Sequence, residues 1–457
     1  MRLTPGTLDR LPPDIGRFAY DREAQSIGIV HFGLGAFHRA HQARYTDLAM
    51  SGGERGWAIA GVSLRSGAVA EQLNPQAGLY SLTERGGGAG DAIGAIGAVR
   101  EALVAGRDRA AIVMRMAARE CHVASFTVTE KGYARKADDS LDFVLAETGF
   151  YPLLAEGLAL RRDAGLPGVT LLSCDNLPDN GRQLERLVRE WLALREPDLV
   201  EWFESECRCP NSMVDRIVPA TTPNDLDALE ARTGLRDEGA VFAEPFSQWV
   251  IEDRFAGPRP GWDKVGAELV TDVAPYETAK LRMLNGAHSA MAYLGLERGH
   301  EYVDQAIADP ALRPLVEQLM RREAATSFTP ASGQDLEAYA DALLVRFANA
   351  ALRHRLAQIA MDGSQKIPQR WLASLAVHQA RGELCGATLT ALAAWLRHVR
   401  GGPWVDDPLA AELAAAWRRN GTAEIVPAVF GPGRLIASAW IPNEQERALL
   451  ERELART

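Results

Sequence analysis

The sequence lacks any long hydrophobic run. No stretch approaches the eighteen or so apolar residues of a membrane span, and the N-terminal Met-Arg-Leu-Thr-Pro-Gly lacks the apolar segment of a signal peptide. An excess of positive charge is absent too, because the formal net charge is -10 at pH 7. An acidic chain disfavours nonspecific binding to nucleic acid or to an anionic membrane. We therefore expect a cytoplasmic protein whose partners are small molecules.

Cysteine is scarce and scattered. An odd number in a long chain is typical of reduced thiols rather than of a disulfide framework. The only close pair has a C-x-C spacing with no second pair and no histidine nearby, so we expect no zinc site there. The five cysteines are Cys121, Cys174, Cys207, Cys209 and Cys385.

The overall composition is that of a globular protein, with 47% apolar and 24% charged residues in 457. Residues 1–24 form a proline-rich, polar N-terminal arm. Strand and helix patterns then alternate through residues 25–275, which predicts an α/β fold, a Rossmann-like domain. Alanine- and leucine-rich helical patterns fill residues 276–457, which predicts a mainly α-helical second domain. The single candidate strand in that domain is Glu424–Val429.

The α/β half opens with a strand pattern over residues 26–31 and the turn Phe32-Gly33-Leu-Gly35-Ala36-Phe37, followed by a helix pattern. Glycines let a pyrophosphate approach the backbone, and a helix N-terminus supplies free N–H groups. The third glycine of the dinucleotide-binding fingerprint is missing, because position 38 is histidine. The turn by itself therefore leaves a cofactor site and an ordinary strand-to-helix connection both open.

Histidines are concentrated around this turn, at His31, His38 and His41. Only His38 and His41 would share a helical face, at i and i+3, and no carboxylate stands at ligand spacing. We expect packing or phosphate contact rather than a metal site.

The expected second strand, residues 57–63, is not followed by a carboxylate. An acidic residue there would bind the ribose of NAD, but the chain reads Leu64-Arg65-Ser66. Arg65 could pair with the 2′-phosphate of NADP, stack on adenine or point to solvent. NAD is the expected cofactor, and NADP stays open.

Polar residues follow two further strand patterns, residues 122–129 and 168–173, where the chain reads Glu130-Lys131-Gly132-Tyr133 and Cys174-Asp175-Asn176. The carboxyl ends of strands are where open α/β sheets bind ligands. We expect residues 267–273 to be the last strand of this half.

The stretch Lys280-Leu-Arg-Met-Leu-Asn285-Gly-Ala-His288 is the strongest candidate for catalysis. At about 100° per residue, Asn285 and His288 are neighbours at i and i+3, and Lys280 lies within roughly 140° of both. One wide helical face could carry an amine, an amide and an imidazole. A surface lysine, a capping asparagine and a core histidine are the alternative for each residue taken alone.

Taken together, these features resemble the polyol-specific long-chain dehydrogenase/reductase family. The resemblance runs from about Ile27 to about Arg370 and implies metal-independent hydride transfer between a nicotinamide and a secondary alcohol. It implies Lys280 as acid/base, Asn176 and Asn285 as amides that hold the reacting oxygen, and His288 as the residue that orients substrate. Seven blocks carry it: residues 29–42, 127–133, 172–178, 213–219, 244–253, 280–288 and 362–368.

The resemblance also implies the remaining site residues. The glycine turn (Phe32, Gly33, Gly35, Ala36, Phe37) and Arg65 would bind cofactor, and Asp215 would lie near the lysine and the nicotinamide, contacting cofactor or substrate. For Asp215 a structural carboxylate capping a turn is the alternative. A monomer is the expected state, with a dimer left open.

The substrate is harder to predict. Lys366 matches a family substrate contact, whereas Gln358 stands where the mannitol dehydrogenases have arginine. The segment from Gln358 to Arg370 is more similar to the fructuronate reductases, so Lys366 and Arg370 could hold the carboxylate of a uronate. A keto-uronate and hexonate pair, D-fructuronate and D-mannonate, is the first choice. Fructose and mannitol, or another polyol such as arabinitol, come second, and a catalytically silent nucleotide-binding protein is a remote third.

Overall fold

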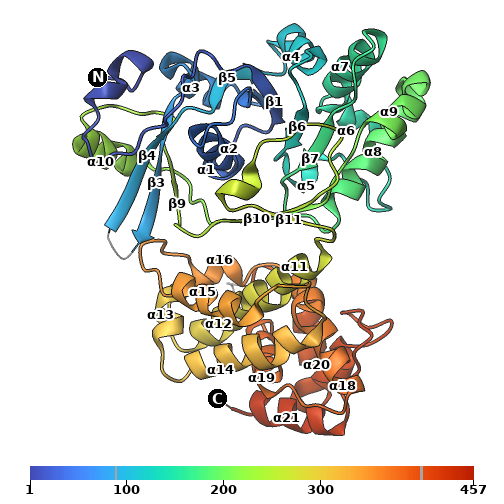
Figure 1. The fold of residues 1–457 in the computed structure, drawn as a ribbon. Helices are drawn as coiled ribbons and strands as arrows, with labels where there is room; N and C mark the ends of the chain where they lie inside the picture. The colour runs from blue at the N-terminus through green and yellow to red at the C-terminus, as the bar shows by residue number, and fades with distance from the viewer. Residues whose placement is uncertain (88–89, 402–404, 457) are drawn as a thin grey trace. The chain divides into compact units, whose positions relative to one another are not determined.

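The computed structural model describes residues 1–87, 90–401 and 405–456. The chain divides into two compact units, Met1–Val273 and Ala274–Thr457, and Figure 1 shows the fold of each.

The first unit is organised around a parallel sheet in the strand order β5-β2-β1-β6-β7. Val30 of the central strand pairs with Ala60 on one side and Ala124 on the other. Strands are confirmed within the patterns predicted at residues 26–31, 57–63, 122–129 and 168–173, although the third ends at Phe126 and Thr129 already begins a helix. Because the strands are parallel, their carboxyl ends share one edge of the sheet, and the order reverses direction between β1 and β6. The strands are β1 (Ile27–Phe32), β2 (Ala58–Ser63), β5 (Val99–Val104), β6 (Val123–Phe126) and β7 (Thr170–Ser173).

Alternate residues of the central strand belong to two separate hydrophobic cores, since successive side chains point to opposite faces of a sheet. Val30 and Phe32 pack with residues of α4, α7 and α8, whereas Ile29 packs with residues of α2 and α3. Helices therefore cover both faces, which is the Rossmann-like arrangement. The helices of this unit are α1 (Ala36–Ala40), α2 (Gln42–Ser51), α3 (Ala68–Leu73), α4 (Arg109–Ala117), α5 (Thr129–Gly132), α6 (Phe143–Ala146), α7 (Tyr151–Asp163), α8 (Asn180–Arg195), α9 (Val200–Glu206) and α10 (Pro223–Thr233).

Two small sheets complete the unit. β3 (Tyr80–Gly87) and β4 (Gly90–Ile96) pair in antiparallel register. Residues 88–89 between them lie outside the described residues. β9 (Val241–Ala243) pairs parallel with β3, and the other sheet has the order β11-β10-β8.

The strand expected at residues 267–273 is shorter and lies outside the main sheet. β11 (Glu268–Val270) pairs parallel with β10 (Gln248–Glu252), which in turn pairs antiparallel with β8 (Ser212–Asp215). The N-terminal arm packs on the β3–β4 side through Leu3, Leu11 and Ile15, which are all buried.

The second unit is helical. Its helices are α11 (Ala274–Ala279), α12 (Gly286–Glu297), α13 (Val303–Ala308), α14 (Arg313–Gln318), α15 (Leu336–Phe347), α16 (Leu356–Ile359), α17 (Gly363–Ile367), α18 (Ala373–Ala380), α19 (Gly386–His398), α20 (Ala410–Val429) and α21 (Glu444–Leu454). Their buried faces form one continuous core. Within the described part of the chain, no helix has the length and apolarity needed to traverse a lipid bilayer.

The strand predicted at Glu424–Val429 is wrong, because this segment is the C-terminal part of α20. Gly421 adopts a non-helical conformation (φ 61°) that breaks the helix, and the chain resumes helical geometry after it. Ile425, Val426 and Val429 are buried in the helical core. A short apolar run of this kind cannot be assigned to strand or helix by periodicity, and here packing against other helices decides.

Candidate active site

The glycine turn after β1 is a conformation that only glycine can supply at its first position. Gly33 has φ +104°, and a Cβ added there would lie 2.1 Å from the backbone oxygen of Thr127. At Gly35 the nearest atom to an added Cβ is the Gly33 oxygen, 3.7 Å away, so the space beside the N-terminus of α1 is open. Gly35, Ala36 and Phe37 are partly exposed, whereas the Phe32 side chain is fully buried and stacks on Phe126. The first N–H groups of a helix have no partner within it, so this turn suits a pyrophosphate, and Phe32 can face it only through its backbone.

Two stacked imidazoles replace the missing third glycine. The rings of His31 and His38 are 3.4 Å apart and inclined by 13°, which lets α1 approach β1 closely although neither residue is small. His31 is fixed by Ser125 Oγ and Thr127 Oγ1, each 2.8 Å from a ring nitrogen. The expectation that His38 and His41 share a helical face is wrong, because the helix breaks at His41 (φ -117°, ψ -95°). His41 packs instead on Phe37, so these histidines serve packing.

Burial lowers the pKa of His31 to about 3 and holds the pKa of His38 well below its ordinary value. As pH falls below about 6.5, the unfolded chain therefore takes up protons that the folded chain cannot, and stability is lost. Between pH 7 and pH 5 we expect His31 to remove about 2 kcal/mol of unfolding free energy, and His38 to add a loss of the same sign. His38→Phe keeps a planar ring against His31 but cannot take up a proton, so its stability should fall less steeply. Urea unfolding at pH 7, 6 and 5 tests this, and parallel declines in both proteins would contradict it.

Hydrogen bonds join the loops that follow β1, β6 and β7. Thr127 Oγ1 donates to the Gly33 carbonyl at 2.7 Å. The Asp175 carboxylate accepts from the backbone N–H groups of Val128 and Thr129 at 2.9 and 2.8 Å, and from the Tyr133 hydroxyl at 2.9 Å. Burial raises the pKa of Asp175, an effect that these donors oppose. The three loops at the carboxyl edge of the sheet are therefore fixed to one another.

The loop that carries Asn176 is tied to β8, which carries Asp215, through Asn180. The fully buried Asn180 amide donates to the carbonyls of Asp175 and Ser212, at 3.0 and 2.7 Å, and its oxygen accepts from the Ser212 N–H at 2.9 Å. Asn176 itself is exposed, whereas Asp215 is buried at the end of its strand. Asp175 and Asn180 were not predicted as site residues, although both stand in the polar segment after β7.

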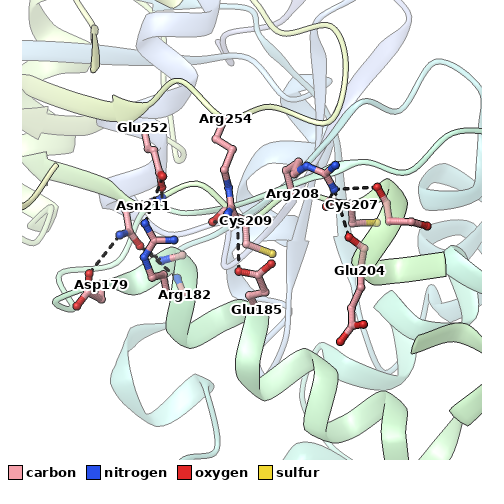
Figure 2. A network of polar contacts seen from close by, with 12 residues as sticks. Asp179, Arg182, Glu185, Glu204, Cys207, Arg208, Cys209, Asn211, Glu252 and Arg254 are labelled. Carbon is pink, nitrogen blue, oxygen red and sulfur yellow. Dashed lines mark hydrogen bonds and ion pairs between the residues drawn. The ribbon is translucent and has the colours of Figure 1, made fainter. Parts of the chain in front are cut away.

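Figure 2 shows further polar contacts between residues at the start of α8, the segment before β8 and β10. Asn211 donates from its side chain to Asp179 at 3.2 Å and from its backbone to Glu252 at 2.9 Å. Arg182 pairs with Glu252 at 3.4 Å. Partly exposed ion pairs add little stability, so the main effect of the network is to fix the start of α8 against the segment before β8.

Arg65 lies just beyond the end of β2, the neighbour of β1, and is exposed. It forms no hydrogen bond or ion pair with any residue that the structure describes. Its guanidinium is therefore available to a ligand of either kind, a 2′-phosphate or an adenine ring, and its predicted role in cofactor binding stays a prediction.

In the second unit, Lys280 and Asn285 lie at the two ends of a π-helical turn. The turn Lys280–Asn285 joins α11 to α12 in one continuous helix. π-turns are rare in proteins, and many of those that occur lie at functional sites. In an α-helix successive side chains are rotated by about 100° about the helix axis, and the extra residue of a π-turn changes this rotation. The face that we expected Lys280, Asn285 and His288 to share therefore cannot be calculated from α-helical geometry. Arg282 of the same turn donates to the carbonyl and hydroxyl of Ser327, at 2.8 and 2.9 Å.

His288, in the first turn of α12, is buried beside a phenyl ring, a second imidazole and two arginines. Its ring is 4.8 Å from that of Phe347 and 5.4 Å from that of His354. Burial, followed by the nearby His354, Arg346 and Arg370, holds the pKa of His288 well below its ordinary value. The imidazole is therefore neutral at physiological pH and can both donate and accept a hydrogen bond. Arg346 and His354 were not predicted, because no motif spacing connects them to His288.

The two residues proposed from sequence to read a carboxylate differ in their surroundings. Lys366 in α17 donates to the Met361 carbonyl at 2.6 Å and lies 3.6 Å from Asp362. Arg370 lies in a second π-turn, Pro368–Leu372, and donates from one nitrogen to the Ser289 hydroxyl at 2.7 Å and to the Asn285 carbonyl at 3.3 Å. The structure thus connects Arg370 directly to the stretch that carries Lys280 and His288. Among the described residues there is no group of His, Cys, Asp and Glu arranged to hold a metal ion.

A parallel sheet with a glycine turn at its switch point and polar loops along the same edge is the architecture of a Rossmann-like dinucleotide-binding domain, and the second unit adds a helix that carries a lysine. The chain belongs to the mannitol dehydrogenase family: the Mannitol dehydrogenase Rossmann domain matches residues 27–264, and the Mannitol dehydrogenase C-terminal domain matches residues 272–430. It is therefore an oxidoreductase, and the resemblance seen in its motifs is confirmed.

The chain is similar over most of its length to oxidoreductases of sugar acids and of polyols. D-mannonate oxidoreductase of Escherichia coli (strain K12) is 39% identical over 445 residues, which cover 93% of this chain and 91% of that protein. Mannitol 2-dehydrogenase of Aspergillus terreus is 36% identical over 438 residues, covering 88% and 86%. Among solved structures, the ternary complex of Pseudomonas fluorescens mannitol 2-dehydrogenase with NAD and D-mannitol is 32% identical, with a TM-score of 0.80 and coverage of 99% and 96%.

Proposed function

We propose that this protein catalyses the NAD-linked interconversion of a keto-uronate and the matching hexonate, with D-fructuronate and D-mannonate as the first pair to test. The 39% identity to D-mannonate oxidoreductase over 93% of the chain carries the proposal. The surroundings of His288 support an anionic substrate, because the Arg346 guanidinium is among the groups that lower its pKa and opposite charges attract.

The proposed roles follow from what the reaction requires. A bound nicotinamide would supply the hydride for reduction of the keto group or accept it in the reverse direction. Lys280 gives a proton to the carbonyl oxygen in reduction and removes it from the hydroxyl in oxidation. Asn176 and Asn285 donate hydrogen bonds to that oxygen as its charge develops, without a proton equilibrium of their own. The neutral His288 orients the substrate, and Asp215 contacts cofactor or substrate.

The glycine turn is proposed to bind the pyrophosphate through Gly33, Gly35, Ala36, Phe37 and the backbone of Phe32. Arg65 is proposed to lie at the adenosine end. The NAD in the mannitol 2-dehydrogenase complex supports NAD as the cofactor. The absence of a carboxylate after β2 leaves NADP as the alternative, which Arg65 would favour.

Purified protein mixed with NADH or NADPH and a panel of keto-sugars tests the function. Fructuronate, tagaturonate and fructose are assayed for reduction, and mannonate, mannitol and arabinitol for oxidation with NAD or NADP, by absorbance of the reduced cofactor. We expect the fastest turnover with fructuronate and NADH. A higher kcat/KM for fructose and mannitol would favour the second candidate, which the similarity to mannitol 2-dehydrogenases supports. Cofactor binding without turnover of any compound would contradict catalysis of these reactions.

Lys366→Ala should raise KM for a uronate by about tenfold or more and leave KM for a neutral ketose nearly unchanged. The reason is that its ammonium group, which donates to the Met361 carbonyl and lies 3.6 Å from the carboxylate of Asp362, can form a charge-assisted bond with a substrate carboxylate. Steady-state kinetics with fructuronate and fructose measure the difference. Gln365→Ala, at an exposed neighbouring position, is the matched control. An equal effect of Lys366→Ala on both substrates would remove the carboxylate role.

A further inference from the structure

Two π-turns of the second unit lie against each other, and consecutive side chains of one bind the other. Arg370 and Trp371 belong to the turn Pro368–Leu372. Arg370 donates to the Asn285 carbonyl at 3.3 Å and to the Ser289 hydroxyl at 2.7 Å, and the Trp371 indole N–H donates to the Gly286 carbonyl at 3.1 Å. All three acceptors lie where the π-turn Lys280–Asn285 passes into α12.

Burial and charge strengthen these hydrogen bonds. Trp371 and Ser289 are each 1% exposed, and burial lowers the pKa of Arg370 to about 10, which still leaves it charged at neutral pH. A charge-assisted hydrogen bond in such surroundings is stronger than a neutral one. A π-turn is less regular than an α-helix, so external donors at its end restrict the directions in which its side chains point.

We propose that Arg370 is a positioning residue for catalysis: by binding Asn285 and Ser289 together, it fixes the orientation of the stretch that carries Lys280, Asn285 and His288. The proposal rests on the proposed function of that stretch. It replaces the role that the sequence suggested for Arg370, recognition of a substrate carboxylate. Loss of a positioning residue slows turnover of every substrate, whereas loss of a residue that binds the substrate carboxylate weakens only the binding of charged substrates.

Arg370→Met removes the donors and keeps a side chain of similar length. We expect kcat to fall by about tenfold to a hundredfold with both fructuronate and fructose, because small misplacements of reacting groups cost rates of this order. KM for each should change by less than about threefold. Arg370→Lys, which keeps a charged donor, should recover most of kcat. Arg313→Met removes an exposed arginine paired with Glu317 in the same unit and serves as the control.

Hydrogen–deuterium exchange of peptides that cover residues 280–295 gives a second measurement, independent of any substrate. Exchange should be faster in Arg370→Met than in the parent protein and unchanged in Arg313→Met. If Arg370→Met does not fold, Ser289→Ala removes one acceptor from the buried site, and the same direction of change in kcat and exchange is expected.

The outcomes separate the two hypotheses. A selective rise in KM for fructuronate, with unchanged exchange, would overturn the positioning role and restore carboxylate recognition. If the parent protein turns over no compound in the panel, the proposed function fails, and the exchange measurement alone decides: faster exchange in Arg370→Met supports the positioning of this stretch, and unchanged exchange refutes it.

Discussion

Lys280→Ala should reduce turnover by about 10²- to 10⁴-fold, the usual contribution of a general acid or base. The amine is the group that we propose to exchange a proton with the reacting oxygen, and Lys280 begins the π-turn that also carries Asn285. Cofactor affinity should change little, because the proposed pyrophosphate site lies in the glycine turn of the first unit. Steady-state kinetics give the first quantity, and titration of NADH fluorescence gives the second.

Chemical rescue sharpens this test of Lys280. Small primary amines such as methylamine should restore part of the activity of Lys280→Ala, and the restored rate should follow the concentration of added amine. Lys136→Ala, at an exposed position of the first unit, should behave like the parent protein. Turnover of Lys280→Ala that matches the parent would remove the acid/base role, and a large loss of NADH affinity would place the lysine in the cofactor site.

Gly33→Ala should lower the free energy of unfolding by roughly 2–5 kcal/mol and abolish dinucleotide binding in the protein that still folds. Two costs add at this position. The positive φ of +104° is unfavourable for any residue with a Cβ, and that Cβ would lie 2.1 Å from the Thr127 oxygen. Thr127 cannot move freely, because its hydroxyl is bonded to His31 and Gly33. Urea unfolding and NADH titration measure the two effects.

Gly53→Ala separates the conformational cost from the clash. Gly53 has nearly the same φ, +109°, but an added Cβ would meet nothing within 4 Å. The substitution should therefore cost only about 1–2 kcal/mol, the ordinary penalty of a left-handed conformation, and should leave NADH binding unchanged. Equal costs at the two positions would show that the approach to Thr127 can relax.

Four of the five parallel strands were predictable from sequence because each is a short run of β-branched and apolar residues bounded by turn residues. β5 (Val99–Val104) was not predicted, since Arg100 and Glu101 interrupt its apolar run. The polar groups at their ends were predictable for the same reason, since strand ends of a parallel sheet share an edge. The hydrogen bonds that join these loops could not be predicted. Asp175, Thr127 and Asn180 act through backbone groups of residues far from them in the chain, which no local pattern reveals.

The second unit was less predictable. The sequence indicates helices, but a π-turn differs from an α-turn by one residue, and hydrophobic periodicity over a single turn does not resolve that difference. The strand predicted at Glu424–Val429 failed because burial of Ile425 and Val426 among helices overrides their β propensity. Arg370 was assigned by charge alone, whereas its hydrogen bonds to Asn285 and Ser289 depend on how the two π-turns pack.

The π-turn Lys280–Asn285 also limits how this part of the chain can vary in evolution. Deleting one residue from the turn would rotate everything after it by about 100° relative to α11. His288 and the acceptors of Arg370 and Trp371 would then face other neighbours. Surface loops can gain or lose residues without this penalty. Homologous enzymes should therefore differ in length elsewhere, while the number of residues from Lys280 to Ser289 stays constant.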